Sequence, residues 1–319
     1  MGKYVIKRIG LMIFTFFVIV TISFVLIRLL PRELPSDKAL AEIMLERWEA
    51  LGYGKPILVQ YFIYLKGIVT SWDFGTSWYV EFRAPVWDLL ISRLPPTVVV
   101  NLSALLISVP IGIALGIYSA KRKGKAADVF VSTLVMIFVS VPSFVYAFVV
   151  QYLLGYTLGW FPLTVYSLDM AGGWATPKML YSMFPAMLSL SFSEVASLAR
   201  FTRAEMCEAL EGGYMSFLRG RGISRRRAVI HHALKNAMVP ILPNIVASVI
   251  GILAGSVVIE EIFSIPGVGQ LYIRAINLGD YDVFMMNTIF YTFLGLLSGL
   301  AVDLSYGAID PRIRIGEAQ

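Results

Sequence analysis

Long uncharged runs alternate with charged connections along this chain. An α-helix needs about 20 mainly apolar residues to cross a hydrocarbon core about 30 Å thick. Six stretches qualify, and we expect a transmembrane helix in each: residues 9–30, 97–120, 129–154, 180–199, 236–259 and 283–302. The first has a longer apolar core than a secretory signal, so we expect it to stay uncleaved. The pattern predicts an all-α membrane protein with six spans.

Two of these spans are irregular. The uncharged stretch that begins after Asp128 continues to Leu168, which is too long for one crossing and too short for two. We therefore expect the part beyond Leu154 to lie at the membrane interface. Glu194 interrupts the fourth span, which has the weakest apolar pattern of the six.

The connections predict how the chain is organised. We expect three parts: a first transmembrane helix in residues 1–30, an extracytoplasmic segment in 31–96, and a five-helix core in 97–319 that contains a cytoplasmic loop at 200–236. In the extracytoplasmic segment, residues 37–50 can form a helix begun by Ser36 or Asp37. Its tryptophans suit anchoring at the bilayer boundary, and contact with substrate is the alternative.

Basic residues set the orientation. With both termini in the cytoplasm, the predicted inside segments hold most of the lysines and arginines, and the short outside connections hold only Lys178 and Arg274. This is the distribution that the positive-inside rule requires.

The loop at residues 200–236 has an internal pattern of its own. It holds eight Lys or Arg. Gly212 and Gly213 interrupt the preceding helix, Tyr214–Arg221 can form a short helix, and Gly222 can end it. Ser224 can then begin a third helical run. A short helix flanked by glycines below the membrane is suited to docking in a groove of another protein.

Composition agrees with a membrane protein and argues against an enzyme. The chain has 319 residues, 57% of them hydrophobic, and a net charge of +6. The basic cluster is held at a membrane surface, so we expect no nucleic acid partner. The sequence contains no phosphate-binding loop motif and no H-E-x-x-H, and the adjacent His231 and His232 cannot chelate one metal from a helix. We expect no catalytic residue, metal or cofactor.

Few ionisable residues fall inside the predicted spans. Glu194 and Asp303 are the candidates for ionisable groups within the membrane. A charge at the bilayer centre costs about 2.5–3.5 kcal/mol even on the insertion scale. Glu194 can therefore line a polar pathway or sit near water at the cytoplasmic end, and the sequence leaves both open. An ion-driven transporter normally needs more such groups, which indicates that energy comes from outside the chain.

The fifth span carries a face of small residues. Ser248, Gly251, Gly255 and Ser256 can line a passage, or they can let helices pack closely. The sequence favours neither.

At the cytoplasmic loop the chain resembles the permease subunits of ATP-binding-cassette importers, in particular the first permease type of the dipeptide/oligopeptide family. The matching residues are Tyr214–Ser224, Arg226-Arg227, His232–Ala237 and Pro240. The chain departs from the general importer signature at Ser216, where that signature has Glu, and at Lys235, where it has Pro. The peptide group shares this degenerate form.

The resemblance covers nearly the whole chain. Further matching strings are Leu51–Tyr61, Asp73–Ser77, Arg93–Thr97, Val141–Phe144, Glu261–Gly269, Val302-Asp303 and Asp310–Arg314. Each is weak alone, but their order and spacing are specific. The turn after the first span differs from the family pattern.

The resemblance implies a complex in the lipid bilayer with a second homologous permease, two cytosolic ATP-binding subunits and an extracytoplasmic substrate-binding protein. ATP and Mg would bind the partner ATPases and not this chain. The cargo would be peptides, or else oligosaccharides or nickel. The residues that would couple to an ATPase are Tyr214, Ser216, Phe217, Leu218, Arg219, Arg221 and Gly222. Pro266, Gly267 and Gly269 would belong to an outer gate loop.

Two other classes compete with this interpretation. A stand-alone channel or secondary transporter would explain the spans, but it would not explain the helix–glycine–helix loop. A membrane enzyme would need a catalytic set that the sequence lacks.

Overall fold

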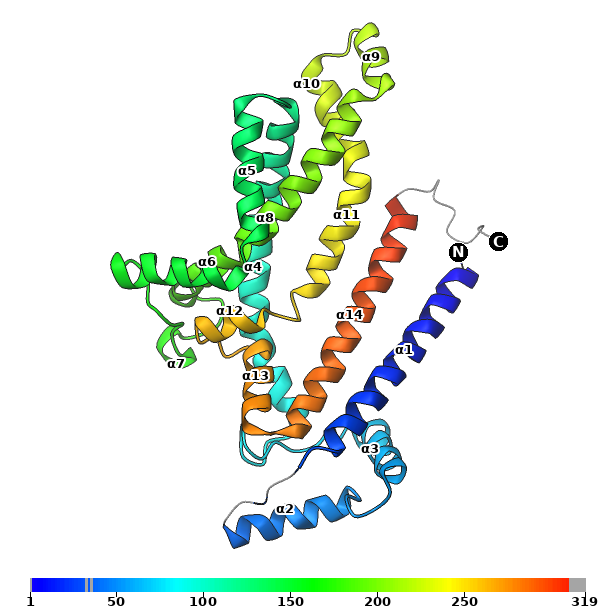
Figure 1. Cartoon of the computed structure of the whole chain (residues 1–319), viewed down its shortest axis with the longest axis vertical. Coiled ribbons are helices and arrows are strands. Elements are labelled where there is room, and N and C mark those ends of the chain that lie inside the picture. The colour runs from blue at the N-terminus through cyan, green and yellow to red at the C-terminus, as the bar shows by residue number, and fades with distance from the viewer. Residues whose placement is uncertain (1, 32–33, 35–36, 310–319) are drawn as a thin grey trace. The chain divides into compact units, whose positions relative to one another are not determined.

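The computed structural model describes residues 2–31, 34 and 37–309 (Figure 1). The regular structure of these residues is helical, apart from one isolated bridge between Thr76 and Pro85. In chain order the elements are α1 (Gly2–Arg28), α2 (Lys38–Ala50), α3 (Ile57–Ser71), α4 (Val86–Lys121), α5 (Ala126–Ser140), α6 (Ser143–Val150), the π-helix η1 (Gln151–Thr157), α7 (Leu168–Ala171), α8 (Pro177–Glu211), α9 (Gly213–Gly220), α10 (Arg225–Arg227), the π-helix η2 (Ala228–Ala233), α11 (Leu234–Gly251), α12 (Val257–Ile262), α13 (Val268–Leu278) and α14 (Tyr281–Ile309).

The helices confirm an all-α membrane protein. In the described residues, four helical stretches are long and apolar enough to cross a bilayer: Val5–Arg28, Val86–Lys121, Arg225–Gly251 and Tyr281–Tyr306. A bent pair, Ala126–Ser140 with Ser143–Thr157, would make a fifth. Helix α8 is long enough to span but is not among the stretches that are sufficiently apolar.

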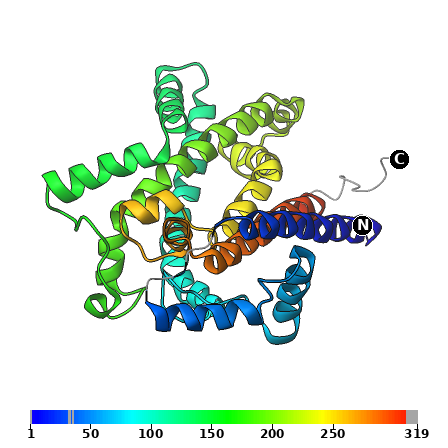
Figure 2. The same cartoon turned by 60° about the horizontal axis from the view of Figure 1, so that its bottom comes forward.

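The third predicted span is not one continuous helix. Helix α5 ends at Ser140, and the next helical segment leaves it at 101° (Figures 1 and 2). Val141 is extended and Pro142 begins α6 as its N-cap, because proline lacks an N–H and disfavours helix at the residue before it. The predicted span from residue 129 to 154 is therefore bent sharply at Pro142.

The fifth predicted span ends earlier than expected. Helix α11 stops at Gly251, and α12 begins only at Val257 after Ser256, which has extended backbone angles. Gly255 between them has φ +69°, which ends regular α-helix geometry. The predicted helix from residue 236 to 259 is two helices.

The chain divides into two compact units, of which the first contains residues Leu94–Gln270. Helix α8 is central to it and packs against α5, α6 and α11. Gly112 and Gly116 of α4 also approach α8 closely: a Cβ on Gly112 would lie 2.7 Å from Leu198 Cβ, and one on Gly116 would lie 2.8 Å from the Ala199 carbonyl oxygen. Glycine permits this close packing.

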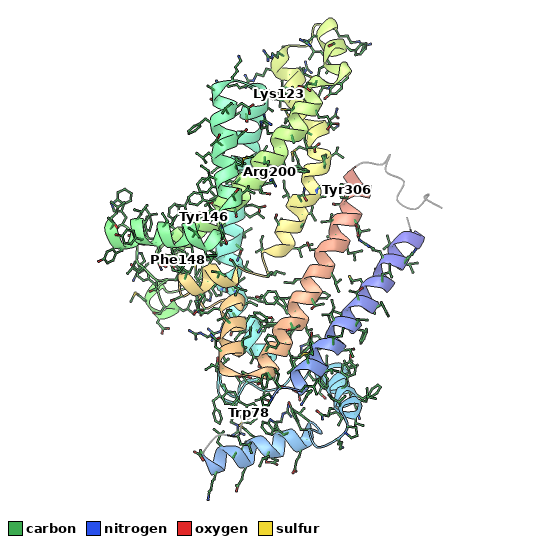
Figure 3. All side chains as sticks on the ribbon, in the orientation of Figure 1. Trp78, Lys123, Tyr146, Phe148, Arg200 and Tyr306 are labelled. Atoms are coloured by element: carbon green, nitrogen blue, oxygen red, sulfur yellow. The ribbon has the colours of Figure 1, made fainter. Side chains whose placement is uncertain are left out.

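A buried ion pair fixes α5 to α8 in this unit. The Arg203 guanidinium donates to both oxygens of Asp128, at 2.6 Å from Nε and 2.8 Å from Nη2. Ser119 Oγ and the Gly124 N–H donate to the same carboxylate. Such a bidentate, fully hydrogen-bonded pair defines the geometry of the α4–α5 turn on α8. Figure 3 shows Lys123 in this turn; its ammonium pairs with Glu211 at the end of α8.

The second unit contains Lys7–Arg93 and Leu271–Leu296. Val20, Phe24 and Ile27 of α1 form its core with Tyr64 of α3 and Met285 of α14.

The predicted helix at 37–50 is confirmed as α2, and Asp37 caps it by accepting from the Ala39 N–H at 2.9 Å. Ser36, the alternative cap, lies outside the described residues, as do the motif residues 310–314.

One carboxylate fixes the loop that precedes α4. Asp280 Oδ2 accepts hydrogen bonds from Ser77 Oγ at 2.7 Å and from the N–H groups of Trp78, Tyr79 and Val80 at 2.9–3.1 Å. Asp280 is buried, so these donors replace the water that its charge would otherwise need.

Candidate functional site

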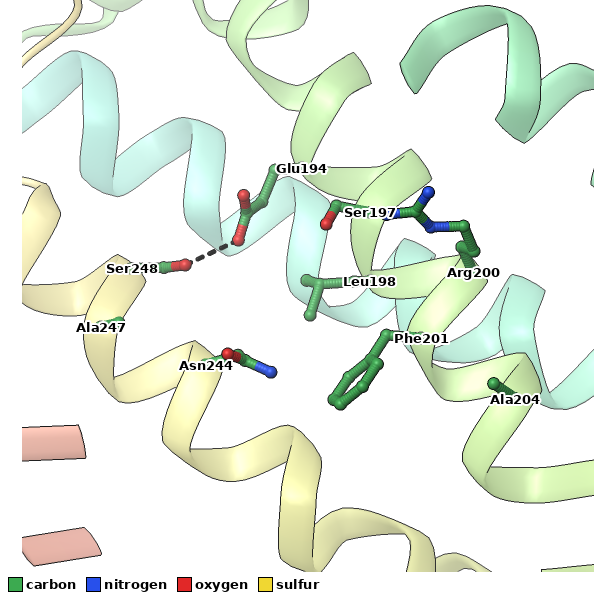
Figure 4. Close-up of a pocket in the computed structure, with 9 residues that line it drawn as sticks. All are labelled: Glu194, Ser197, Leu198, Arg200, Phe201, Ala204, Asn244, Ala247 and Ser248. Carbon is green, nitrogen blue, oxygen red and sulfur yellow. Dashed lines mark hydrogen bonds between the residues drawn. The ribbon is translucent and has the colours of Figure 1, made fainter. Parts of the chain in front are cut away.

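A cavity of about 480 Å³ lies between α8 and α11 in the first unit (Figure 4). Glu194 and Ser248 meet there: Ser248 Oγ donates to Glu194 Oε1 at 2.8 Å. The lining residues from α8 are Glu194, Ser197, Leu198, Arg200, Phe201 and Ala204, and those from α11 are Asn244, Ala247 and Ser248. The cavity therefore combines a carboxylate, a guanidinium and small polar groups with apolar walls.

A second cavity, of about 230 Å³, shares Glu194 and Ser248 with the first. It extends toward α4, where Asn101 and Ser108 line it, and it reaches Gly251. Three of the predicted pathway residues, Glu194, Ser248 and Gly251, thus line hollows in the structure. Because Glu194 lines both, its carboxylate stands where the two cavities adjoin.

Gly255 and Ser256, the other two predicted pathway residues, line neither of these cavities. Ser256 is the N-cap of α12, and Gly255 lies against the side chains of Glu260 and Thr97. The structure groups them with the predicted outer gate loop.

That loop is organised around a buried carboxylate. Glu260 on α12 is 1% exposed. Thr97 Oγ1 donates to its Oε1 at 2.9 Å, and the N–H groups of Gly269 and Gln270 donate to its Oε2 at 2.8 and 3.1 Å. Thr97 Oγ1 in turn accepts from the Val268 N–H at 2.9 Å. The loop that follows α12 is therefore fixed to the start of the second predicted span through one side chain.

Glycines make room for this carboxylate. A Cβ on Gly267 would overlap both Glu260 Oε2 and Thr97 Oγ1, and a Cβ on Gly269 would lie 2.7 Å from Val257 Cα. Gly267 and Gly269 therefore serve close packing around Glu260. Pro266, the third residue of the predicted gate loop, precedes them.

Burial changes the protonation of Glu260, which lies outside the candidate membrane spans. Desolvation raises the pKa of this carboxyl from 4.5 to about 7, against the opposing effect of hydrogen bonds from Gln270, Thr97 and Gly269. The loop thus contains an acid that titrates near neutrality.

Glu260 and Thr97 were not among the site residues predicted from the sequence. Glu260 lies next to Glu261 in a stretch flanked by glycines, and the sequence alone does not show which of two adjacent acids is buried. The available signal was the spacing of Gly255, Gly267 and Gly269 around it, which is typical of close backbone approach.

The short helix predicted at Tyr214–Arg221 is present as α9, which spans Gly213–Gly220. Gly222 follows it with φ +75°, and the Ile223 N–H donates to the Leu218 carbonyl at 3.2 Å, the hydrogen bond of a Schellman C-cap. Ser224 Oγ then accepts from the Arg227 N–H at 3.4 Å and begins the helical run that leads into α11.

The two faces of α9 differ. Met215 is buried, and Tyr214, Leu218 and Ile223 pack with it against Ala209, Ala228 and Val229. The opposite face is exposed and presents Ser216, Phe217, Arg219 and Arg221, with Phe217 59% exposed. The Arg221 guanidinium lies 4.6 Å from the centre of the Phe217 ring. This face therefore carries an exposed aromatic ring, Phe217, beside the positive charges of Arg219 and Arg221.

The described residues contain no group of three or more His, Cys, Asp or Glu placed to hold a metal ion.

Comparisons with known proteins find family matches in the N-terminal region and in the remainder of the chain. Residues 112–315 match the family described as "Binding-protein-dependent transport system inner membrane component". Residues 1–101 match the N-terminal part of membrane components of the same kind of system.

Individual relatives match over their full length. The chain is 35% identical over 316 residues to the dipeptide transport system permease protein DppB of Lactococcus lactis, covering 99% of this chain and 100% of that protein. It is 34% identical over 317 residues to the oligopeptide transport system permease protein OppB of Salmonella typhimurium, covering 98% and 100%.

The packing around Glu260 yields a prediction for Gly267. Gly267→Ala should lower the free energy of unfolding by about 2–3 kcal/mol, because the added Cβ has no room beside Glu260 and Thr97. Gly299→Ala is the matched control, since a Cβ there meets nothing within 4 Å. The measurement is the thermal unfolding midpoint in detergent. Equal midpoints for the two variants would contradict the close packing.

The raised pKa of Glu260 yields a prediction of pH dependence. An acid whose pKa is higher in the folded protein stabilises the fold fully below its ordinary value of 4.5, and this contribution is lost as pH rises through about 7. The shift corresponds to about 3 kcal/mol across that range. We therefore expect the stability of the wild type to fall with rising pH relative to that of Glu260→Gln. A difference that is constant from acid to neutral pH would show that the carboxyl titrates normally.

Two neighbouring glycines test the end of α9. Gly222→Ala should lower the stability of the closed α9 segment by about 1 kcal/mol, because the φ of +75° at Gly222 disfavours any residue with a Cβ. Gly220→Ala should cost nothing, since Gly220 has a helical φ and open space around its Cα. Limited proteolysis of residues 211–224 in the purified permease measures the opening of this segment. Faster cleavage is expected only in Gly222→Ala, and equal cleavage of both variants would contradict the assigned C-cap.

Proposed function

This chain belongs to the family of binding-protein-dependent transport system inner membrane components, and we propose that it imports dipeptides or oligopeptides. It is a multi-pass inner membrane protein and a permease subunit without catalytic activity of its own. The observation that carries the peptide assignment is the match, from end to end, to permeases of dipeptide and oligopeptide systems. Oligosaccharide or nickel cargo, which the sequence left open, has no such support among these relatives.

We propose that the chain works with a second homologous permease, two cytosolic ATP-binding subunits and an extracytoplasmic substrate-binding protein. The ATPases supply the energy, and this chain supplies one half of the passage. ATP binding then acts by favouring one arrangement of the spans over another.

The exposed face of α9 is the proposed docking element for one ATPase. Phe217, Ser216, Arg219 and Arg221 would contact the ATPase, while Tyr214 and Leu218 hold α9 to the rest of the permease. Gly222 would set the end of the helix. An exposed aromatic side chain surrounded by arginines is the composition that interface hot spots favour.

We also propose six spans, with both termini in the cytoplasm. Helix α8 would be the remaining span despite its modest apolarity. Its packing against α5, α6 and α11 supports this, because Glu194 then faces a cavity and not lipid.

Reconstitution tests the function directly. Proteoliposomes that contain this permease, its partner permease and the ATPases should accumulate labelled di- and tripeptides when ATP and the binding protein are supplied. Accumulation without ATP, or of peptides by this chain alone, would instead indicate a secondary transporter.

A single truncation tests the docking face. Phe217→Ala should reduce the amount of ATPase that co-purifies with the permease at least about tenfold, as loss of a central aromatic hot spot does. Phe82→Ala is the matched control, because Phe82 is also exposed, at 56%, and lies in the predicted extracytoplasmic segment. If both variants retained wild-type amounts of ATPase, α9 would not be the docking element.

A further inference from the structure

We propose that the cavity between α8 and α11 binds the two charged ends of a short peptide, with Glu194 taking the α-ammonium group and Arg200 taking the α-carboxylate. The inference rests on the proposed function and assigns residues to the cargo. It concerns the permease itself, apart from any selection by the binding protein.

Glu194 has unused capacity to accept hydrogen bonds. Its carboxylate is half-buried and receives one hydrogen bond, from Ser248. An ionised carboxylate offers about four acceptor positions. No cation of the described chain pairs with it, although a charge among apolar walls gains from a partner. A primary ammonium group supplies both the opposite charge and three donors.

Arg200 supplies the positive charge that would bind the carboxylate end of the peptide. It lines the same cavity, six residues further along α8, and none of the described residues hydrogen-bonds or pairs with its guanidinium. Figure 4 shows Ser197 between Glu194 and Arg200. A guanidinium binds a carboxylate through two parallel hydrogen bonds, which a lone lysine cannot do.

The separation and the space both fit a short peptide. Six residues of α-helix advance about 9 Å along the axis, so the Cα atoms of Glu194 and Arg200 lie about that far apart in this direction. An extended peptide covers about 3.3–3.6 Å per residue, so two or three residues bridge that distance. The cavity volume of about 480 Å³ lies in the usual range for small-molecule sites.

The rest of the lining is suited to many side chains. Leu198, Phe201, Ala204 and Ala247 give apolar walls without a shaped pocket for one residue type, and Asn244 offers an amide to the peptide backbone. Recognition of the termini would leave the sequence of the cargo free, as a permease for varied peptides requires.

Peptides that are chemically blocked at one terminus test the two proposed subsites separately. The complete complex in proteoliposomes, with its ATPases and loaded binding protein, is assayed for uptake of dialanine, N-acetyl-dialanine and dialanine amide. Each rate is expressed as variant over wild type for the same peptide, so that any preference of the binding protein cancels.

Each variant should impair uptake of the peptides that carry the terminus it recognises and spare the peptide in which that terminus is blocked. Glu194→Gln should lower uptake of dialanine and dialanine amide about tenfold, as loss of a charge-assisted hydrogen bond does, and leave N-acetyl-dialanine within about twofold. Arg200→Gln should lower uptake of dialanine and N-acetyl-dialanine about tenfold and leave the amide within about twofold. Glu208→Gln is the matched control: Glu208 is exposed on the same helix, outside the cavity, and all three rates should stay unchanged.

A second measurement covers blocked peptides that the binding protein does not carry. Binding of labelled dialanine to the nucleotide-free complex, without binding protein, is competed with each blocked peptide, and the dissociation constants should show the same crossed pattern. A uniform loss for all peptides, or no loss, would overturn the terminal subsites while leaving peptide import intact. If the wild-type complex carried no peptide although loaded binding protein stimulated its ATPases, the proposed cargo itself would be wrong.

Discussion

The packing of α8 against its neighbours is the contact on which the other features of the first unit depend. Two glycines of α4 let the helices approach until backbone and side chains touch, and the Asp128–Arg203 pair fixes α5 to the same helix. Removing Arg203 would leave the buried carboxylate of Asp128 without its cation, which is costly. Helix α8 is therefore held along its length by steric and electrostatic contacts together.

Helix α8 links the cavity at Glu194 to α9, the proposed docking helix. Helix α8 runs without interruption from Pro177 to Glu211, and α9 follows directly after Gly212. The buried side of α9 packs on the end of α8 and on η2. Because close-packed interiors transmit displacement, a movement imposed on α9 would reach Glu194 through one helix. On the opposite side of the cavity, η2 continues into α11, so both walls lead to the proposed docking helix α9.

Sequence periodicity predicted the helices where a local rule was sufficient. Asp37 and Ser224 as caps and Gly222 as a helix end are set by one residue and its near neighbours, and the structure has each of them. The break at Gly255 and the size of the bend at Pro142 were missed, because apolar length does not distinguish one straight helix from two joined ones. Glu260 was missed for a related reason: its donors Thr97 and Gly269 lie at separations that no local pattern connects.

The buried carboxylates differ in how fully they are satisfied, and this difference points to function. Asp280 accepts from four donors, Asp128 is paired with Arg203 and receives further donors, and Glu260 accepts from three. Each of these three carboxyl groups holds chain segments together through its hydrogen bonds, so its acceptor positions are already occupied. Glu194 accepts one hydrogen bond beside a cavity. Under the proposed terminal subsites, the open acceptor positions of Glu194 would be filled by the ammonium group of the cargo.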